Sequence, residues 1–372
     1  MALYWLAYEI TGSAWALGIL GFCEAAPRLL LGAVGGVIVD RYDRLRLLTA
    51  IQFLCCIPVF GLVALYFLDM LQFWHMALLE TLWATMRSMN PTAGQSILRE
   101  LVPEAELMSA VSLYSIGFNF ARIVGPSIGG VLILWIGVGG CMVFYGVCLV
   151  ISAIELLGVR VPSSAPADAA GSLLNEFKEG LDYIRGRPMI LASIIAAYVI
   201  SIFVGTYTRF LAVFAKDVLQ VGPDGLGLLV AAPGVGAVAS LIVLGALEER
   251  WNRTRLLWFS AKATPFLLIL FCLSRSLWLS VLLLGLFGGM QIIFRTVSRL
   301  VIQVEAPREL LGRVMSVFLM DQGMRSLGSV VMGGFVSLFG AALGLALTSA
   351  VSIALTGVTF YRLLLAPKPA AG

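Results

Sequence analysis

The nine residues Asp40–Leu48 (DRYDRLRLL) return in altered form at Glu249–Leu257 (ERWNRTRLL), 209 positions further along the chain. In both copies an acid leads the motif, and a glycine, Gly36 or Gly245, stands four residues before that acid. A long apolar segment precedes each copy. The motif therefore marks the same place in two related halves of the chain.

A second pair of similar segments lies downstream, at an offset of 204 residues. It matches Pro103 with Pro307, Leu107 with Leu311, Ser112 with Ser316, and Gly129-Gly130 with Gly333-Gly334. Two echoes at nearly the same offset indicate that the chain is a duplicated half. In a membrane protein, parallel halves of this kind are typical of transporters whose site lies between them.

The composition is that of a membrane protein. Apolar residues make up 60% of the 372 residues and charged residues only 12%, against about 25% charged residues in soluble domains. Eleven segments approach or exceed the roughly 20 apolar residues that cross a bilayer core. They are 15–39, 45–67, 71–91, 107–135, 138–160, 188–214, 223–247, 256–274, 277–302, 310–338 and 341–365. Since lipid admits only helices or closed barrels, and these runs are too long for barrel strands, we predict an all-α polytopic protein.

The first ten residues are shorter than a crossing, because a helix of that length spans only about 15 Å. They contain Glu9 and lack the basic start of a signal peptide. We expect them to be the outer end of an incomplete first helix, which gives about 11.5 of twelve transmembrane helices.

The expected domain organisation follows from these spans. It consists of an N-terminal bundle over 1–160, a cytoplasmic linker over 161–187, a C-terminal bundle over 188–366 and a cytoplasmic tail over 367–372. Residues 172–185 of the linker form an amphipathic pattern. A helix lying on the membrane surface and a solvated linker helix both fit that pattern.

Lysines and arginines set the orientation. They concentrate in the loops near Arg41, Arg185 and Arg253 and in the tail, whereas the opposite side carries Lys216 and Arg275. The positive-inside rule then places the linker and the C-terminus in the cytoplasm. The net charge of +4 reflects this topology and does not indicate a nucleic-acid partner.

Three segments resemble the major facilitator superfamily, in its drug and siderophore exporter branch of enterobactin-exporter-like and macrolide-efflux-like proteins. They are Gly36–Arg44, Asn90–Gly130 and Pro307–Ser316. The resemblance covers the whole chain and implies two pseudo-symmetric six-helix bundles that rock around a midplane cavity. It also implies a monomer in the bacterial inner membrane. The chain departs from the superfamily in its short first helix and in Asp43, where the superfamily usually has glycine.

The two repeated loops are interpreted as a cytoplasmic gate. A carboxylate can dock on the positive N-terminus of another helix, and the resemblance implies the helix near Leu310 for Asp40 and the helix near Leu107 for Glu249. The gate residues are Gly36, Asp40, Arg41, Arg44, Glu249 and Arg250. The alternative is that these charges only determine topology.

The segment Gly125-Pro126-Ser-Ile-Gly129-Gly130 lies within a predicted span. Proline removes a backbone hydrogen bond, and small residues allow close helix contact. We therefore predict a kink and a tight packing interface at Gly125, Pro126, Gly129 and Gly130. In the superfamily a pattern of this kind is characteristic of antiporters, although Ala121 replaces a glycine here.

Eight bases and four acids of the spans are the candidate intramembrane charges. The bases are Arg28, Arg87, Arg122, Arg209, Lys262, Arg295, Arg299 and Arg325, and the acids are Glu24, Glu80, Glu155 and Asp321. A charge at the bilayer centre costs about 2.5–3.5 kcal/mol on insertion scales, so such residues are functional candidates by default.

Spacing sorts these charges into candidate sites. Glu24 with Arg28, and Asp321 with Arg325, are four apart and share a helix face, as do Glu80, Trp83 and Arg87. The predicted substrate and proton pathway is Glu24, Arg28, Glu80, Arg87, Asn119, Arg122, Asp321 and Arg325. One interpretation is that a carboxylate exchanges a proton while an arginine holds substrate, and the surplus of bases favours an acidic substrate. The other is that the pairs neutralise one another structurally.

The predicted function is export of an amphipathic small molecule (a drug, siderophore or metabolite) in exchange for protons. Proton-coupled uptake and a non-transporting scaffold or sensor are the alternatives. An enzyme is not expected, because the chain has one histidine and no HExxH motif. Six scattered cysteines without a CxxC motif predict neither a metal site nor a cofactor.

Overall fold

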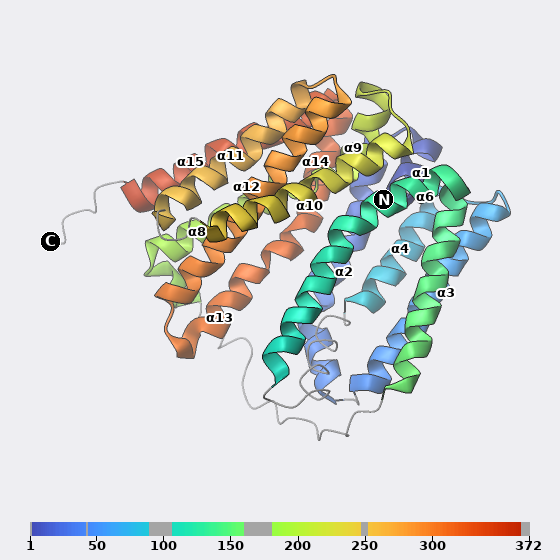
Figure 1. Ribbon diagram of the computed structural model, residues 1–372, viewed down its shortest axis with the longest axis horizontal. Coiled ribbons are helices and arrows are strands. Elements are labelled where there is room, and N and C mark those ends of the chain that lie inside the picture. The colour runs from blue at the N-terminus through green and yellow to red at the C-terminus, as the bar shows by residue number, and fades with distance from the viewer. Residues whose placement is uncertain (1, 42–43, 89–105, 160–180, 247–251, 366–372) are drawn as a thin grey trace. The chain divides into compact units, whose positions relative to one another are not determined.

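The computed structural model describes residues 2–41, 44–88, 106–159, 181–246 and 252–365. The side chains of residues 28–44, and of many residues between 107 and 134, lie outside this description. The described residues fold into helices joined by short turns and include no strand, which confirms the all-α fold class. Contacts divide the chain into two compact units, Met1–Ala170 and Gly171–Gly372 (Figure 1).

Unit 1 contains five described helices. They are α1 (Ala2–Thr11), α2 (Ala14–Arg41), α3 (Arg44–Phe67), α4 (Phe73–Arg87) and α6 (Leu107–Gly158). Helix α3 packs on α4 and α6, α2 packs on α4, and α1 contacts α2, α4 and α6. The backbone of α6 turns at Gly137, where φ is 70° and ψ is 178°. That left-handed conformation suits glycine, and it separates two helices at the boundary expected between spans 107–135 and 138–160.

Unit 2 contains the remaining described helices. They are α8 (Pro188–Phe203), α9 (Tyr207–Val213), α10 (Pro223–Ala246), α11 (Arg253–Leu273), α12 (Leu277–Glu305), α13 (Arg308–Leu319), α14 (Asp321–Phe339) and α15 (Ala341–Phe360), with π-helical turns η2 (Phe214–Val218) and η4 (Tyr361–Leu365). Helix α12 packs on α10 and α11, while α8 packs on α14 and α15. Phenylalanines fill the centre, with Phe210, Phe214, Phe271, Phe287 and Phe294 fully buried.

Seven of the described helices are long and apolar enough to cross a membrane by length and composition. Large apolar side chains also remain exposed on their surfaces, including Trp135, Trp278 and Leu338. Such exposure would be costly in water, but lipid tails are an apolar solvent for these side chains. The helices and their surfaces therefore agree with a polytopic membrane protein.

Two spans that the sequence predicts as continuous helices are interrupted. Span 188–214 breaks at Val204–Thr206, where the amides of Val204 and Gly205 both donate to the Ile200 carbonyl oxygen, at 2.9 and 2.8 Å. Span 310–338 breaks at Met320, whose ψ of −11° tightens the turn between α13 and α14. Apolar periodicity does not reveal such breaks, because both sides remain apolar across them.

Helices α10 and α12 approach until their backbones touch. A Cβ atom built on Gly288 of α12 would overlap the backbone of Pro233 in α10, and one on Gly236 of α10 would overlap the backbone of Gly285. In contrast, a Cβ atom on Gly285 itself would have Ala232 O at 3.7 Å as its nearest neighbour. Small residues at a crossing allow this close packing between membrane helices.

The last residues of the linker pack against unit 2. Residues 181–185 are helical, and Ile184 is buried. The hydroxyl of Tyr183 donates to the carbonyl oxygen of Glu305, at the end of α12, over 2.9 Å. This end of the linker is therefore attached to the helices of unit 2, while residues 172–180 of the predicted amphipathic helix lie outside the described ranges.

Candidate transport site

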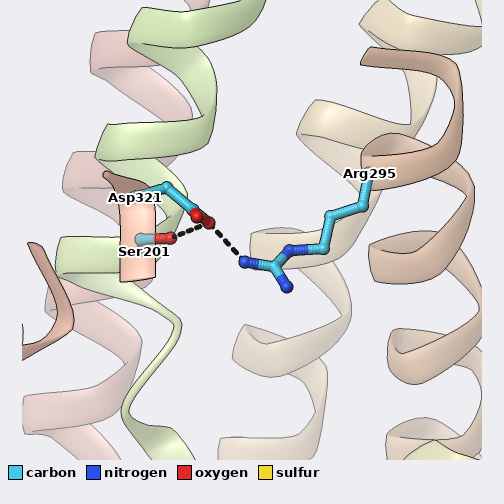
Figure 2. Close-up of polar contacts among 3 residues, drawn as sticks. All are labelled: Ser201, Arg295 and Asp321. Carbon is cyan, nitrogen blue, oxygen red and sulfur yellow. Dashed lines mark hydrogen bonds and ion pairs between the residues drawn. The ribbon is translucent and has the colours of Figure 1, made fainter. Parts of the chain in front are cut away.

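Asp321 is the centre of a polar cluster in unit 2. Among the described residues it is the one charged residue that is buried, and it begins α14 directly after the helix break. The hydroxyl of Ser201 in α8 donates to its Oδ2 atom over 3.0 Å. Arg295 of α12 donates through Nη2 to the same oxygen and forms an ion pair with it. Figure 2 shows the carboxylate held between the hydroxyl and the guanidinium.

The two ends of this ion pair differ in exposure. The side chain of Asp321 is 4% exposed, whereas that of Arg295 is 28% exposed. Burial of an unpaired carboxylate is costly, so Asp321 depends on Arg295 and Ser201 for compensation. Arg295 also presents part of its surface beyond the pair.

Polar contacts connect α8 and α9 to α13 and α14 on both sides of this cluster. Tyr198 donates from its hydroxyl to the carbonyl oxygen of Val317 over 2.5 Å, and Arg209 donates through Nη1 to the hydroxyl of Ser329. Between these contacts, a Cβ atom on Gly328 would overlap the backbone of Ile202. The interrupted segments 188–214 and 310–338 therefore contact each other close to the residues where each is interrupted.

The structure extends the predicted pathway around Asp321. Spacing paired this acid with Arg325 on its own helix, and the structure adds Arg295 and Ser201 from α12 and α8. The carbonyl oxygen of Arg325 accepts a 3.0 Å hydrogen bond from the Ser329 hydroxyl. Sequence reasoning counted Arg295 among the intramembrane bases but did not include it in the site. Its partner is 26 residues away, so no helical periodicity connects them.

Glu24 is the described acid near the middle of α2 in unit 1. It is half-buried, and the hydroxyl of Tyr4 in α1 donates to its Oε2 atom over 2.6 Å. Sequence spacing did not suggest this partner. The side chain of Arg28, its predicted partner, lies outside the described residues.

Arg87 and Trp83 of α4 share a face as the spacing predicts. The guanidinium carbon of Arg87 lies 4.7 Å from the centroid of the Trp83 ring, which is a cation–π arrangement. Trp83 also meets Tyr145 of α6 edge to face, with centroids 6.4 Å apart. Glu80 is half-buried on the same helix.

Several predicted site residues lie outside the part of the structure whose surroundings are described. They are the pathway residues Asn119 and Arg122, the packing residues Pro126 and Gly130, and the gate residues Gly36, Asp40, Arg41, Arg44, Glu249 and Arg250. No described atom lies within 4 Å of a Cβ atom built on Gly125 or Gly129. The roles expected for these residues stay predictions.

Comparison with known proteins supplies the context for this geometry. The model of a family described as transmembrane secretion effectors, within the major facilitator superfamily, matches residues 1–371. The chain is 24% identical to the staphyloferrin A transporter of Staphylococcus aureus, over 97% of this chain and 91% of that protein. It is 23% identical to the enterobactin exporter of Shigella boydii, over 87% of this chain and 78% of that protein.

The fold is also similar to a solved transporter structure. The crystal structure of the nucleoside transporter NupG matches with a TM-score of 0.75, covering 98% of this chain and 94% of that chain at 13% sequence identity. The expected fold and the expected superfamily are both confirmed. The chain is a membrane transporter of the major facilitator superfamily and belongs to its transmembrane secretion effector family.

Proposed function

We propose that this protein exports an amphipathic small molecule from the cytoplasm in exchange for protons, by alternating access of its two halves. The observation that carries this proposal is the ion pair between the buried Asp321 of α14 and Arg295 of α12. Intramembrane ion pairs are expensive to maintain and mark substrate or ion pathways. One relative is named an enterobactin exporter, which supports export, and another is named a staphyloferrin A transporter, which supports transport.

The candidates for the proton carrier are the acids Glu24, Glu80 and Asp321, and one of them suffices for exchange. Each lies within a helix, and the first two are half-buried while the third is buried. Antiport requires that the proton and the substrate occupy the protein alternately, so that release of one accompanies binding of the other. Arginines near these acids, such as Arg87 and Arg295, would hold substrate or stabilise the ionised carboxylates.

We further propose that the protein works as a monomer in the bacterial inner membrane, with its C-terminus in the cytoplasm. The charge distribution of the loops supports this orientation. A cysteine introduced into the tail, at Ala370, should be labelled by a membrane-impermeant maleimide only after the cells are opened. Labelling of intact cells would reverse the orientation.

Export is tested in a strain that lacks this gene, with and without the gene on a plasmid. Under the proposal, a panel of drugs and siderophores includes at least one compound that the complemented strain secretes or resists better. Everted membrane vesicles should accumulate that compound when their interior is acidic, and collapse of the pH gradient should stop accumulation. Accumulation in intact cells instead would indicate uptake, and no flux for any compound would favour a scaffold or sensor.

The gate proposal predicts that Asp40→Asn abolishes most transport at normal surface expression. A carboxylate docked on a helix N-terminus contributes about 0.3–1 kcal/mol when exposed and up to about 2 kcal/mol when partly buried. Loss of the larger value would shift the balance between conformations by roughly thirtyfold. Asp43→Asn in the same loop is the matched control, because it removes one negative charge without altering the end of α2. Equal transport by both variants would leave only a role in topology.

A further inference from the structure

We infer that Arg295 binds an acidic group of the transported molecule, and that Asp321 is a resident counter-ion which this group displaces. The inference rests on the proposed function, because the ligand is the exported molecule. It adds a substrate class, molecules that carry a carboxylate, and it assigns a receptor residue that helical spacing did not find.

The first argument is the balance of charge around Asp321. Arg295 contacts Asp321, and Arg325 lies one turn from it on α14, so two arginines stand beside the one buried carboxylate among the described residues. An anionic ligand lowers the cost of holding guanidinium charge inside a bilayer.

The second argument is which partner a ligand can reach. The side chain of Asp321 is 4% exposed, whereas that of Arg295 is 28% exposed, so Arg295 is the more accessible member of the pair. A guanidinium carries five N–H donors in a planar fork that matches a carboxylate. One of these donors, on Nη2, points at Asp321. An incoming carboxylate can thus approach the open part of the fork, and a two-pronged contact would be stronger than the single contact that it replaces.

The third argument is that Asp321 keeps a partner after displacement. The hydroxyl of Ser201 still donates to it over 3.0 Å. Asp321 also begins α14 directly after the turn at Met320. The Ser201 hydrogen bond offsets part of the cost of an ionised Asp321 when Arg295 turns toward a ligand, and the contact between Arg295 and the ligand must offset the rest.

This exchange has a consequence for proton coupling. A proton on Asp321 would free Arg295 and strengthen anion binding, so proton and substrate would bind together, which is the linkage of symport. An antiporter requires the opposite relation. For an antiporter, proton exchange is therefore assigned to Glu24 or Glu80 in unit 1, and not to Asp321.

The test is the binding of carboxyfluorescein, an amphipathic carboxylate, to the purified full-length protein in lipid nanodiscs, followed by fluorescence anisotropy. Asp321→Asn removes the resident competitor and should tighten binding by about tenfold, which corresponds to about 1.4 kcal/mol. Arg295→Gln should weaken it by at least about tenfold, while Arg295→Lys should fall between. Arg299→Gln is the matched control, because Arg299 is an exposed base one turn further along α12, and it should bind like the wild type.

Two further measurements separate a direct role from loss of folding. The variant Arg295→Gln/Asp321→Asn contains no buried charge from this pair, and it should remain monodisperse yet bind carboxyfluorescein as weakly as Arg295→Gln. The cation rhodamine 6G should not bind Asp321→Asn more tightly than the wild type, because the freed guanidinium repels it.

The results that overturn the inference differ from those that overturn export. Unchanged or weaker carboxyfluorescein binding by Asp321→Asn, or no saturable binding by any variant, would show that Arg295 is no carboxylate receptor. Secretion by the complemented strain could still be intact in that case. Conversely, the predicted binding pattern together with an absence of secretion would overturn the exporter and retain the anion site.

Discussion

Replacement of Arg295 by methionine is expected to destabilise the protein by about 3–5 kcal/mol, the typical cost of removing one partner from a buried ion pair. The reason is that Asp321 is only 4% exposed and loses its charged partner, retaining the hydrogen bond from Ser201. Asp321→Asn should cost less, because the Arg295 side chain left behind is 28% exposed, whereas that of Asp321 is 4% exposed. Thermal unfolding in nanodiscs, followed by tryptophan fluorescence, measures both effects.

The double variant Arg295→Met/Asp321→Asn provides the decisive comparison. It contains neither charge, so it should recover most of the stability lost in Arg295→Met, as neutral replacements of buried ion pairs commonly do. The coupling energy of the pair is the stability change of the double variant minus the sum of the changes in Arg295→Met and Asp321→Asn. If Arg295→Met and the double variant unfold at the same temperature, a buried uncompensated carboxylate is not what destabilises the single variant.

The second large effect is expected at the crossing of α10 and α12. Gly288→Ala places a methyl group where the backbone of Pro233 already lies, and a backbone cannot move aside as a flexible side chain can. Forced overpacking typically costs about 1–3 kcal/mol and sometimes more. We expect a lower yield of monodisperse protein and a lower Tm.

Gly285→Ala is the matched control for this prediction, on the same helix and nearly one turn away. Its new methyl group would have Ala232 O at 3.7 Å, which is ordinary van der Waals contact. Alanine is also a better helix former than glycine, so this variant should be as stable as the wild type or slightly more stable. Similar losses in Gly285→Ala and Gly288→Ala would indicate that the backbone contact at Pro233 does not determine the effect.

Most helices of this protein could be predicted from the apolar spans alone. The expected gap between 107–135 and 138–160 coincides with Gly137, and span 277–302 corresponds to α12 (Leu277–Glu305). Breaks inside spans were missed, at Val204–Thr206 and at Met320. Hydropathy reports how apolar a segment is, and the segments on both sides of such a break are equally apolar, so the pattern contains no signal for it.

In the candidate site, too, contacts within one helix could be predicted from the sequence, whereas contacts between helices could not. Spacing brought Trp83 and Arg87 together, and the structure confirms their contact at 4.7 Å, because residues four apart on a helix are neighbours whatever surrounds them. Glu24 and Asp321 were identified as candidates from their charge and from their spacing to Arg28 and Arg325. Their described partners Tyr4 and Arg295 come from other helices, and partners of that kind follow only from how helices pack.

The sequence by itself determined that this chain is a duplicated, all-helical membrane transporter, because hydropathy, charge bias and repeats are local properties that lipid and topology constrain directly. Only the tertiary structure decided that Asp321 pairs with Arg295 and Ser201. Those three residues lie on three helices, and their meeting depends on the close approach of α8 to α14 at Gly328 and on the break at Met320. Contacts between distant segments arise from packing geometry, which no periodicity within one segment encodes.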